Sequence, residues 1–183
     1  NDGARLPKGA LVAIGAALKA KAAHGYSRVV GLIIGGSDAT VAAAEGAKYG
    51  LDEVVFIKHD SLQQYLALPC AEALFGAVQE LSPRMILGLS SARGKDLFPR
   101  IAQQVGAGQA SDVIEFLPAN QFKRPMYAGN VVATVEITTE KRVVTVRGSA
   151  FEPAAAGSSA CPVRELTVAL SGGSSQQFVS FDT

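Results

Sequence analysis

The stretch best suited to chemistry covers residues 88–105, GLSSARGKDLFPRIAQQV, where an apolar run leads into a Gly-containing turn and then a helical pattern. Strand, turn and helix N-terminus together hold phosphate in many proteins, because free N–H groups at the helix start face the anion. A Walker A loop needs G-x-x-x-x-G-K followed by Ser or Thr. Here Gly88 and Gly94 are one residue too far apart, and Lys95 precedes Asp96, whose carboxylate repels phosphate and suits a helix N-cap. We therefore predict a capped helix start that hydrolyses no nucleotide and binds ATP no more tightly than about millimolar.

Residues able to form a nucleophilic or metal centre are few. The chain has two histidines, His24 and His59, and two cysteines, Cys70 and Cys161, with no CxxC pair. His24 ends a helical pattern, where positive charge would complement the helix dipole. Cys70 falls on an apolar helix and is expected to be a small core residue. We predict no catalytic residue and no metal site.

Charged residues on turns and strand ends are the remaining candidates for a functional surface. Arg93, Lys95, Arg124 and Arg147 occupy such places. Each is either part of a binding surface or an ordinary solvated charge.

The elements that must position these residues alternate along the first two thirds of the chain. Apolar runs ending in glycine or polar residues predict strands at 27–36, 52–59 and 84–89. Helical patterns cover 11–22, 37–50, 69–81 and 96–106, with Pro99 expected in the first turn of the last one. Such alternation is typical of a parallel sheet with helices on both faces. Because a helix comes first, we expect a further strand before it.

After Gly108 the pattern becomes β-rich. Strands are predicted at 111–117, 122–129, 130–137 and 142–148, with TTEK (138–141) as a hairpin turn between the last two. From Pro153 the chain is rich in small residues and has no core of its own. The predicted fold class is α/β: a three-layer, mostly parallel sheet flanked by helices, with a β-rich C-terminal part.

Composition limits the function classes. The 183 residues are 48% hydrophobic and 18% charged, which is enough for one sizeable α/β domain. The formal net charge is +1 without a long Lys/Arg run, which argues against a nucleic-acid partner. The cysteines fit a reducing compartment.

Several motifs, taken in order, carry a family resemblance. SSARGKDLFPRIAQQV, ASDVIEF, RPMYAGNVVATVE and VVTVRGSAFEPAA follow one another with plausible spacing, from the NDGARLPKGAL start to about PVREL. The combination S-A-x-G-K-D-L-x-P-R, then Y-A-G-N, then V-R-G-x-x-F resembles the α subunit of electron transfer flavoprotein.

That resemblance implies a fold related to adenine-nucleotide-binding α/β domains. It also implies an α/β heterodimer that carries one FAD, held mainly by the C-terminal domain of the α subunit. Such proteins are electron carriers in fatty acid β-oxidation, not enzymes. They take electrons from acyl-CoA and other flavin dehydrogenases and pass them to a membrane quinone oxidoreductase. The location would be the mitochondrial matrix in a eukaryote and the cytoplasm in a bacterium.

The resemblance also divides the chain. Residues 1–152 would be the N-terminal α/β domain without its first strand, and 153–183 a linker toward a flavin-binding domain that the chain lacks. We therefore predict no cofactor-binding residue here and no stoichiometric FAD on this chain alone. The loops SARGK, RPMYAGN and VRGSAF are expected to face the flavin domain or the β subunit. Their candidate residues are Arg93, Gly94, Lys95, Arg124, Tyr127, Gly129, Asn130, Arg147 and Gly148.

Two details of this surface stay open on the sequence alone. The glycines would allow close backbone approach by a partner, or they are plain turn glycines. Phe122, Met126, Tyr127 and Phe151 would be interface anchors, although Tyr127 could instead be a core strand residue. Two other function classes also remain: an adenine-nucleotide-using enzyme of the related fold, such as a pyrophosphatase, and a non-catalytic interaction module.

Overall fold

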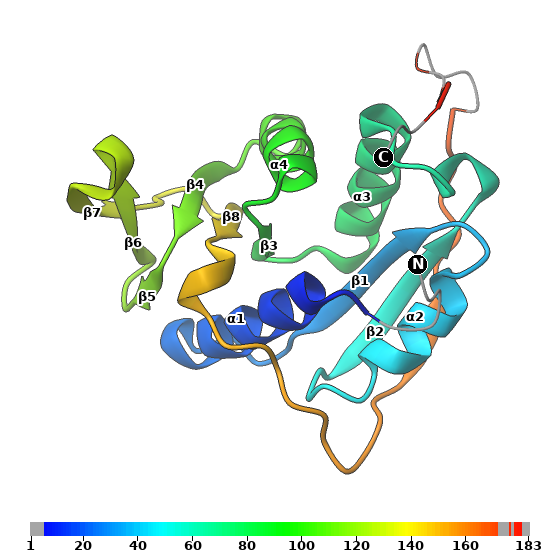
Figure 1. Cartoon of the computed structure of the whole chain (residues 1–183), viewed down its shortest axis with the longest axis horizontal. Helices are drawn as coiled ribbons and strands as arrows, with labels where there is room; N and C mark the ends of the chain where they lie inside the picture. Colours follow the sequence, from blue (N-terminus) through cyan, green and yellow to red (C-terminus); the bar gives the residue numbers. More distant parts are fainter. Residues whose placement is uncertain (1–5, 172–175, 177, 181–183) are drawn as a thin grey trace.

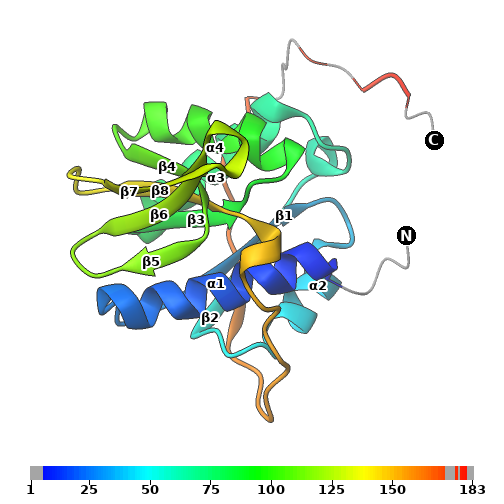
Figure 2. The ribbon, with the colours of Figure 1, turned by 60° about the vertical axis from the view of Figure 1, so that its left-hand side comes forward.

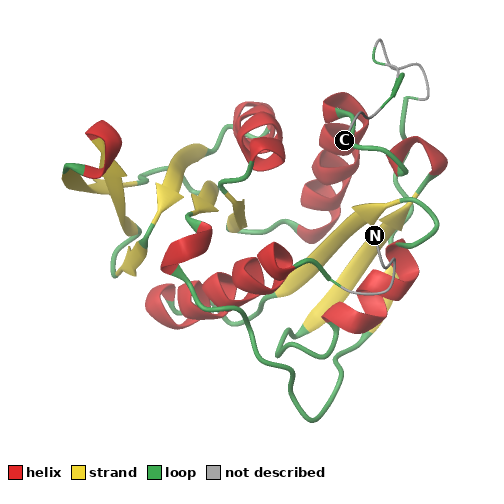
Figure 3. Cartoon of the chain, viewed as in Figure 1, coloured by secondary structure: helices red, strands yellow, loops and turns green. Residues whose placement is uncertain are grey.

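The computed structural model describes residues 6–171, 176 and 178–180 (Figure 1). In chain order the elements are α1 (Lys8–His24), β1 (Val30–Gly35), α2 (Ala39–Gly46), β2 (Glu53–Lys58), η1 (Asp60–Leu62), α3 (Ala67–Leu81), β3 (Met85–Leu89), α4 (Ala92–Gln104), β4 (Gly108–Val113), β5 (Glu115–Leu117), β6 (Gln121–Met126), η2 (Tyr127–Gly129), β7 (Val131–Glu136), β8 (Arg142–Val146), η3 (Gly148–Ala150) and β9 (Val163–Glu165), η being a short 3-10 helix. Helices on both faces of parallel strands, followed by antiparallel strands, confirm the predicted α/β class (Figure 3).

The strands form three small sheets. The first has the order β1-β2-β9 and the second β3-β8-β4, and every pair within them is parallel. The third, β5-β6-β7, is antiparallel and projects beyond β4 at one end of the molecule (Figure 1). The strands β1, β2 and β8 are rich in Val and Ile, as expected for strands covered on both faces.

Four hydrophobic clusters join the layers. On one face, α2 packs on β1 and β2 through Ala39, Ala43 and Val54. On the other face, α3 and α4 pack on β3 and β8 through Leu74, Ile101 and other apolar side chains. The helix α1 lies against β4, β8 and the third sheet, where its buried Val12 and Ala16 meet further apolar side chains. The view of Figure 2 shows α1 beneath β5 and β3 and the helices α3 and α4 on the far side of the sheets.

The predicted hairpin between residues 130–137 and 142–148 is wrong. β7 pairs with β6, whereas β8 inserts between β3 and β4 in parallel orientation. The segment TTEK (138–141) is therefore a loop that connects the third sheet to the second. The single strand predicted at 111–117 is also wrong, because β4 and β5 belong to different sheets.

The start of the fourth helix differs from the prediction as well. α4 begins at Ala92, and its N-cap is Ser91, whose Oγ accepts a hydrogen bond from the Gly94 N–H at 3.1 Å. Asp96 thus lies within the helix and is not the cap. Pro99 also lies inside the helix, past the first turn, and its ring nitrogen leaves one helical carbonyl without its usual donor.

The segment after Pro153 packs on the domain in the residues that are described. β9 extends the first sheet through three pairs with β2, and Leu166, Val168 and Leu170 pack on a cluster formed by α3 and β2. Two arginines hold the strand end: Arg28 and Arg164 both bond the Glu53 carboxylate, Arg164 at 2.7 Å. The division of the chain at residues 152 and 153 stays a prediction, and part of the predicted linker (172–175, 177 and 181–183) lies outside the described residues.

Candidate interaction surface at the carboxyl ends of the parallel strands

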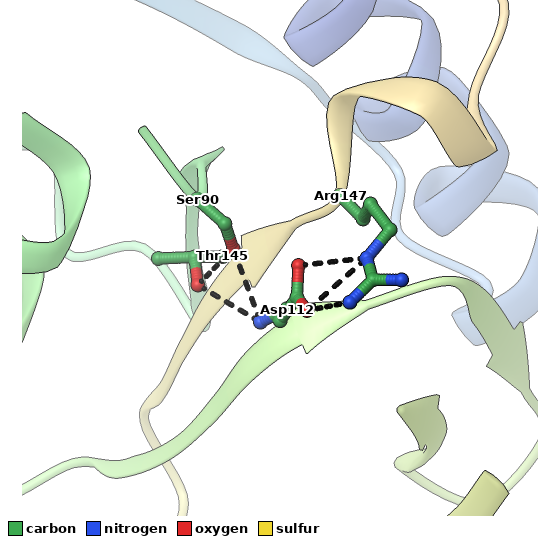
Figure 4. Close-up of polar contacts among 4 residues, drawn as sticks. All are labelled: Ser90, Asp112, Thr145 and Arg147. Atoms are coloured by element: carbon green, nitrogen blue, oxygen red, sulfur yellow. Dashed lines mark hydrogen bonds and ion pairs between the residues drawn. The ribbon is translucent and has the colours of Figure 1, made fainter. Parts of the chain in front are cut away.

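The carboxyl ends of β3 and β8 meet at a partly buried pair of hydroxyl groups. Ser90, directly after β3, donates from its hydroxyl to Thr145 Oγ1 at 2.8 Å, and Thr145 is 1% exposed. The Asp112 N–H donates to both oxygens, at 3.1 and 3.2 Å (Figure 4). These bonds hold a β-bulge, because Ser111 and Asp112 of β4 together face only Thr145 of β8. Asp112 has a φ of 59°, a left-handed conformation that Asp tolerates better than most residues.

The bulge turns the Asp112 carboxylate toward Arg147. The Arg147 Nε–H lies 3.1 and 3.2 Å from the two carboxylate oxygens, and Nη2 donates to the second (Figure 4). The Arg147 N–H also donates to the Val113 carbonyl at 2.9 Å. This forked contact raises the pKa of Arg147 further above its ordinary value. Because a bidentate pair fixes a guanidinium in direction as well as in position, the half-exposed Arg147 is a pre-oriented surface group.

The hydroxyls of this site do not form a nucleophilic centre. The Ser90 Oγ donates to Thr145 and accepts from Asp112 N–H, so neither contact is with a base that could take its proton. The cluster fixes a surface and has no catalytic geometry. Among the described residues, no group of three or more His, Cys, Asp or Glu side chains could hold a metal ion.

The turn at the start of α4 packs tightly against the end of β3. A Cβ on Gly94 would come 1.9 Å from the Leu89 carbonyl oxygen, so this glycine allows the helix to pack on its own strand. The packing of the helix on its own strand thus accounts for this buried glycine, and a partner contact at Gly94 stays a prediction. Gly148 is different: its surroundings leave room for a Cβ, with Leu89 Cδ2 the nearest atom at 3.9 Å, and it is exposed beside Arg147.

Around that turn, Tyr65 and Asp96 form a second polar contact. The Tyr65 hydroxyl donates to Asp96 Oδ2 at 2.9 Å, and Arg100 bonds Oδ1 at 3.0 Å. Burial and the Asp96 carboxylate raise the pKa of Tyr65 to about 12, and the same bonds lower the pKa of Asp96. The exposed Arg93 lies over the Tyr65 ring at 5.2 Å, and Lys95 is exposed beside it. Arg93 and Lys95 are therefore both exposed, as residues that contact a partner must be.

The remaining candidates lie at the tip of the β6–β7 hairpin. Tyr127 is 75% exposed, so it is not a core strand residue. Tyr127 and Ala128 have φ values of 50° and 55° and Gly129 one of 94°, and the Asn130 N–H closes the turn on the Tyr127 carbonyl at 3.2 Å. Apolar side chains surround this tip: Met126, Val131 and Val132 are 39%, 47% and 54% exposed.

Two of the expected anchors are not at the surface. Phe122 is fully buried and Phe151 is 6% exposed, and both belong to the core cluster beneath the third sheet. Phe122 faces inward because alternate residues of a strand point to opposite faces. Arg124, on the same strand, is half-buried, and its Nε is buried without a hydrogen-bond partner.

His24 ends α1, as the sequence suggested, and its ring packs among aromatic side chains. Its ring lies 5.3 Å from Phe122, 5.8 Å from Tyr26 and 6.0 Å from Phe116, centroid to centroid. Burial, together with the positive charge of Arg142, lowers the pKa of His24. Both ring nitrogens are buried without a hydrogen-bond partner, so these surroundings favour the neutral imidazole over its cation.

The structure thus gathers Arg93, Lys95, Arg147 and Gly148 at the ends of β3 and β8, and it presents Tyr127, Gly129 and Asn130 on the hairpin tip. Sequence reasoning missed Ser90, Asp112, Thr145 and Tyr65. Their signal was weak: Ser90 is a small polar residue directly after a predicted strand, a place at which sites form, whereas Asp112 falls inside the strand predicted at 111–117. The pairing of these ends was not visible in the sequence.

The fold and the site define a class of protein: an α/β domain with a partly buried hydroxyl pair at its strand ends and an added antiparallel sheet. Within this class, the chain belongs to the electron transfer flavoprotein domain family, whose model matches residues 1–171. It is 34% identical over 145 residues to the electron transfer flavoprotein subunit alpha of Paracoccus denitrificans, covering 79% of this chain and 46% of that protein.

Two further relatives support the same assignment. The probable mitochondrial subunit alpha of Caenorhabditis elegans is 32% identical over 139 residues, covering 75% of this chain and 42% of the relative. The mitochondrial subunit alpha of Arabidopsis thaliana is 32% identical over 132 residues, covering 69% and 36%. The chain spans less than half the length of these curated relatives.

Proposed function

We propose that this chain is the N-terminal domain of an electron transfer flavoprotein α subunit and that it acts as a platform for assembly. In this role it carries no catalytic residue. It contacts the β subunit and the flavin domain through two surfaces, the strand-end surface around Arg147 and the β6–β7 hairpin tip around Tyr127. The observation that carries the proposal is the pre-oriented Arg147, fixed by Asp112 at an exposed edge, in a chain of this family.

The described residues do not fit FAD at the one turn that resembles a phosphate loop. Gly94 packs against the Leu89 carbonyl, and its N–H donates to Ser91 Oγ. The Asp96 carboxylate lies two residues further along the helix. An anionic diphosphate would find no free N–H at Gly94 and a negative charge nearby. We therefore place FAD on other parts of the assembled protein and expect none in stoichiometric amount on this chain alone.

The partners follow from the family. Dehydrogenases of the acyl-CoA type would donate electrons to the assembled flavoprotein, and a membrane quinone oxidoreductase would accept them. The compartment is the mitochondrial matrix if the source is eukaryotic and the cytoplasm if it is bacterial. Among the described residues, no helix is long and apolar enough to cross a membrane.

The decisive experiment compares the longer α subunit, co-expressed with the β subunit, with a version that lacks residues 6–171. We expect the intact pair to co-purify as a yellow heterodimer that acyl-CoA dehydrogenase reduces, and the truncated pair to lose the β subunit. A truncated pair that stays associated and is reduced at the same rate would contradict the platform role. Flavin bound in near-unit ratio to this chain alone would contradict the placement of FAD.

A further inference from the structure

Three glycines from different segments meet at Leu89, the last residue of β3. A Cβ on Gly9 would come 2.6 Å from Leu89 Cδ1, and a Cβ on Gly94 would come 1.9 Å from the Leu89 carbonyl oxygen. Gly148 leaves room for a Cβ, and the nearest atom to it would be Leu89 Cδ2 at 3.9 Å. The start of α1, the start of α4 and the turn η3 therefore converge on one residue, and η3 lies beside α1 in both views of the ribbon (Figures 1 and 2).

This convergence gathers cationic residues at the carboxyl end of β3. Each of the three glycines is next to one or two cations in the chain, and consecutive Cα atoms are only about 3.8 Å apart. The cations are Lys8, Arg93, Lys95 and Arg147. The first three are exposed, and the side chain of Arg147 is half-exposed. The strand-end surface around Arg147 therefore carries four cations that come from three separate segments.

The positive charge of this surface is not balanced by its own carboxylates. Asp96 and Asp112 lie among the cations, and each of them is already bonded to an arginine. The cations that form no ion pair within the described part of the chain are Lys8, Arg93 and Lys95. Because the whole chain has a formal net charge of only +1, the excess belongs to this surface and not to the chain in general.

Carboxylates spaced along a polypeptide suit this surface better than a phosphate group does. The Asp96 and Asp112 carboxylates among the cations repel a compact anion with several charges, and the Gly94 N–H already donates to Ser91 Oγ. Asp or Glu side chains at helical or strand spacing can instead meet the separate cations one by one. Arg147 adds direction, because Asp112 fixes its guanidinium before a partner arrives.

We propose that the strand-end surface around Arg147 binds an acidic segment of the β subunit, whose Asp or Glu side chains pair with Lys8, Arg93 and Lys95. This inference rests on the proposed function, because it names the chemistry of the partner at a surface assigned there to assembly. Attraction between oppositely charged surfaces mainly raises the rate at which two proteins associate. Dissolved salt screens this attraction, so association through this surface depends on ionic strength.

Charge reversal at the two ends of β3 provides the test, in the longer α subunit mixed with the β subunit by stopped flow. Arg93→Glu changes the charge beyond the carboxyl end of the strand. Arg84→Glu makes the same change before its amino end, where Arg84 is exposed and forms no ion pair among the described residues. We expect Arg93→Glu to slow association at least about threefold at low ionic strength. The difference should nearly vanish in about 1 M salt, where charges more than about 3 Å apart are screened, and Arg84→Glu should associate as the original subunit does.

Equal rates for Arg93→Glu and the original subunit at low ionic strength would overturn the inference, and so would an equal loss in both variants. If the original subunits do not associate at all, the proposed function fails, and a peptide of alternating Glu and Gly tests the surface by itself. Added to the present chain, this peptide should shift the amide NMR signals around Lys8, Arg93 and Lys95, whereas a peptide of alternating Gln and Gly should not. The absence of such shifts, or equal shifts with inorganic pyrophosphate, would overturn the assignment to an acidic polypeptide.

Discussion

Among single residues, Gly94 gives the clearest test of the close contact between α4 and β3. Gly94→Ala would place a methyl group 1.9 Å from the Leu89 carbonyl oxygen. Backbone atoms cannot move aside as a side-chain end can, so we expect a loss of about 1–3 kcal/mol in the free energy of unfolding. Urea denaturation measures it. Gly148→Ala is the matched control: its nearest neighbour would be 3.9 Å away, and the change should be within about 0.5 kcal/mol. Equal effects of the two variants would contradict this assignment.

His24 makes stability depend on pH. Its pKa is lowered in the folded protein, chiefly by burial and also by Arg142, so protons bind more readily to the unfolded chain. The stabilisation is therefore complete above the ordinary histidine pKa of about 6.5 and declines as pH falls through 6.5 toward the lowered value. We expect His24→Gln to flatten this decline. Denaturant midpoints between pH 8 and 5 measure it, and an unchanged slope would mean that His24 is not the responsible group.

The residues missed in the sequence show why side-chain sites are hard to predict. Ser90, Asp112 and Thr145 lie 22 and 33 positions apart in pairs that only the sheet brings together. The left-handed conformation of Asp112 in the bulge directs its carboxylate toward Arg147, and no local sequence pattern indicates a bulge at this position. By contrast, Arg147 and Tyr127 could be selected because charged and aromatic residues on turns stand out without knowledge of the fold.

At the scale of elements, local patterns predicted which segments are helices and strands but not which strands are neighbours. β7 and β8 alternate as a hairpin would, and the short TTEK turn suits one. The strand β8 is buried at four of its five residues and lies between β3 and β4, as the middle strand of its sheet. β7, with exposed residues along its length, is an edge strand. The start of α4 was misplaced for a related reason, since Ser91 and Asp96 are both good N-cap residues and only the packing of Gly94 selects the first.

The strand β9 depends on Glu53, which joins it to the rest of the first sheet. Glu53 is 9% exposed, and its carboxylate bonds Arg28 and Arg164. Glu53→Ala leaves two half-exposed arginines near each other without their anion, and we expect a loss of roughly 1 kcal/mol. Faster amide exchange at Val163–Glu165 should accompany it. Lys123→Ala, which breaks the exposed pair with Glu115, is the control and should change little. Unaltered exchange in β9 would show that apolar packing alone holds the strand.

For the whole molecule, the assembly that we propose would use apolar and cationic groups that are exposed among the described residues. Tyr127, Met126, Val131 and Val132 form an exposed apolar patch on a tip, and patches of this kind mark interaction sites. The residues around Arg147 form a second surface whose geometry is fixed before any partner arrives, which lowers the entropic cost of association.

Tyr127 at the hairpin tip either contacts a partner or supports the fold, and two variants distinguish these roles. Tyr127→Ala, made in the longer α subunit, should weaken assembly with the β subunit or retention of flavin by roughly thirtyfold, the effect of losing about 2 kcal/mol at an aromatic anchor. In the present chain the same variant should melt within a few degrees of the original, because the side chain is 75% exposed. Phe122→Ala, on the preceding strand β6 and fully buried, should instead cost about 3–5 kcal/mol of folding free energy. Equilibrium titration of the two subunits, flavin absorbance and thermal melts provide the measurements. Full assembly with full flavin in the Tyr127 variant would remove this tip from the interface, and early melting of the isolated chain would show that Tyr127 supports the fold instead.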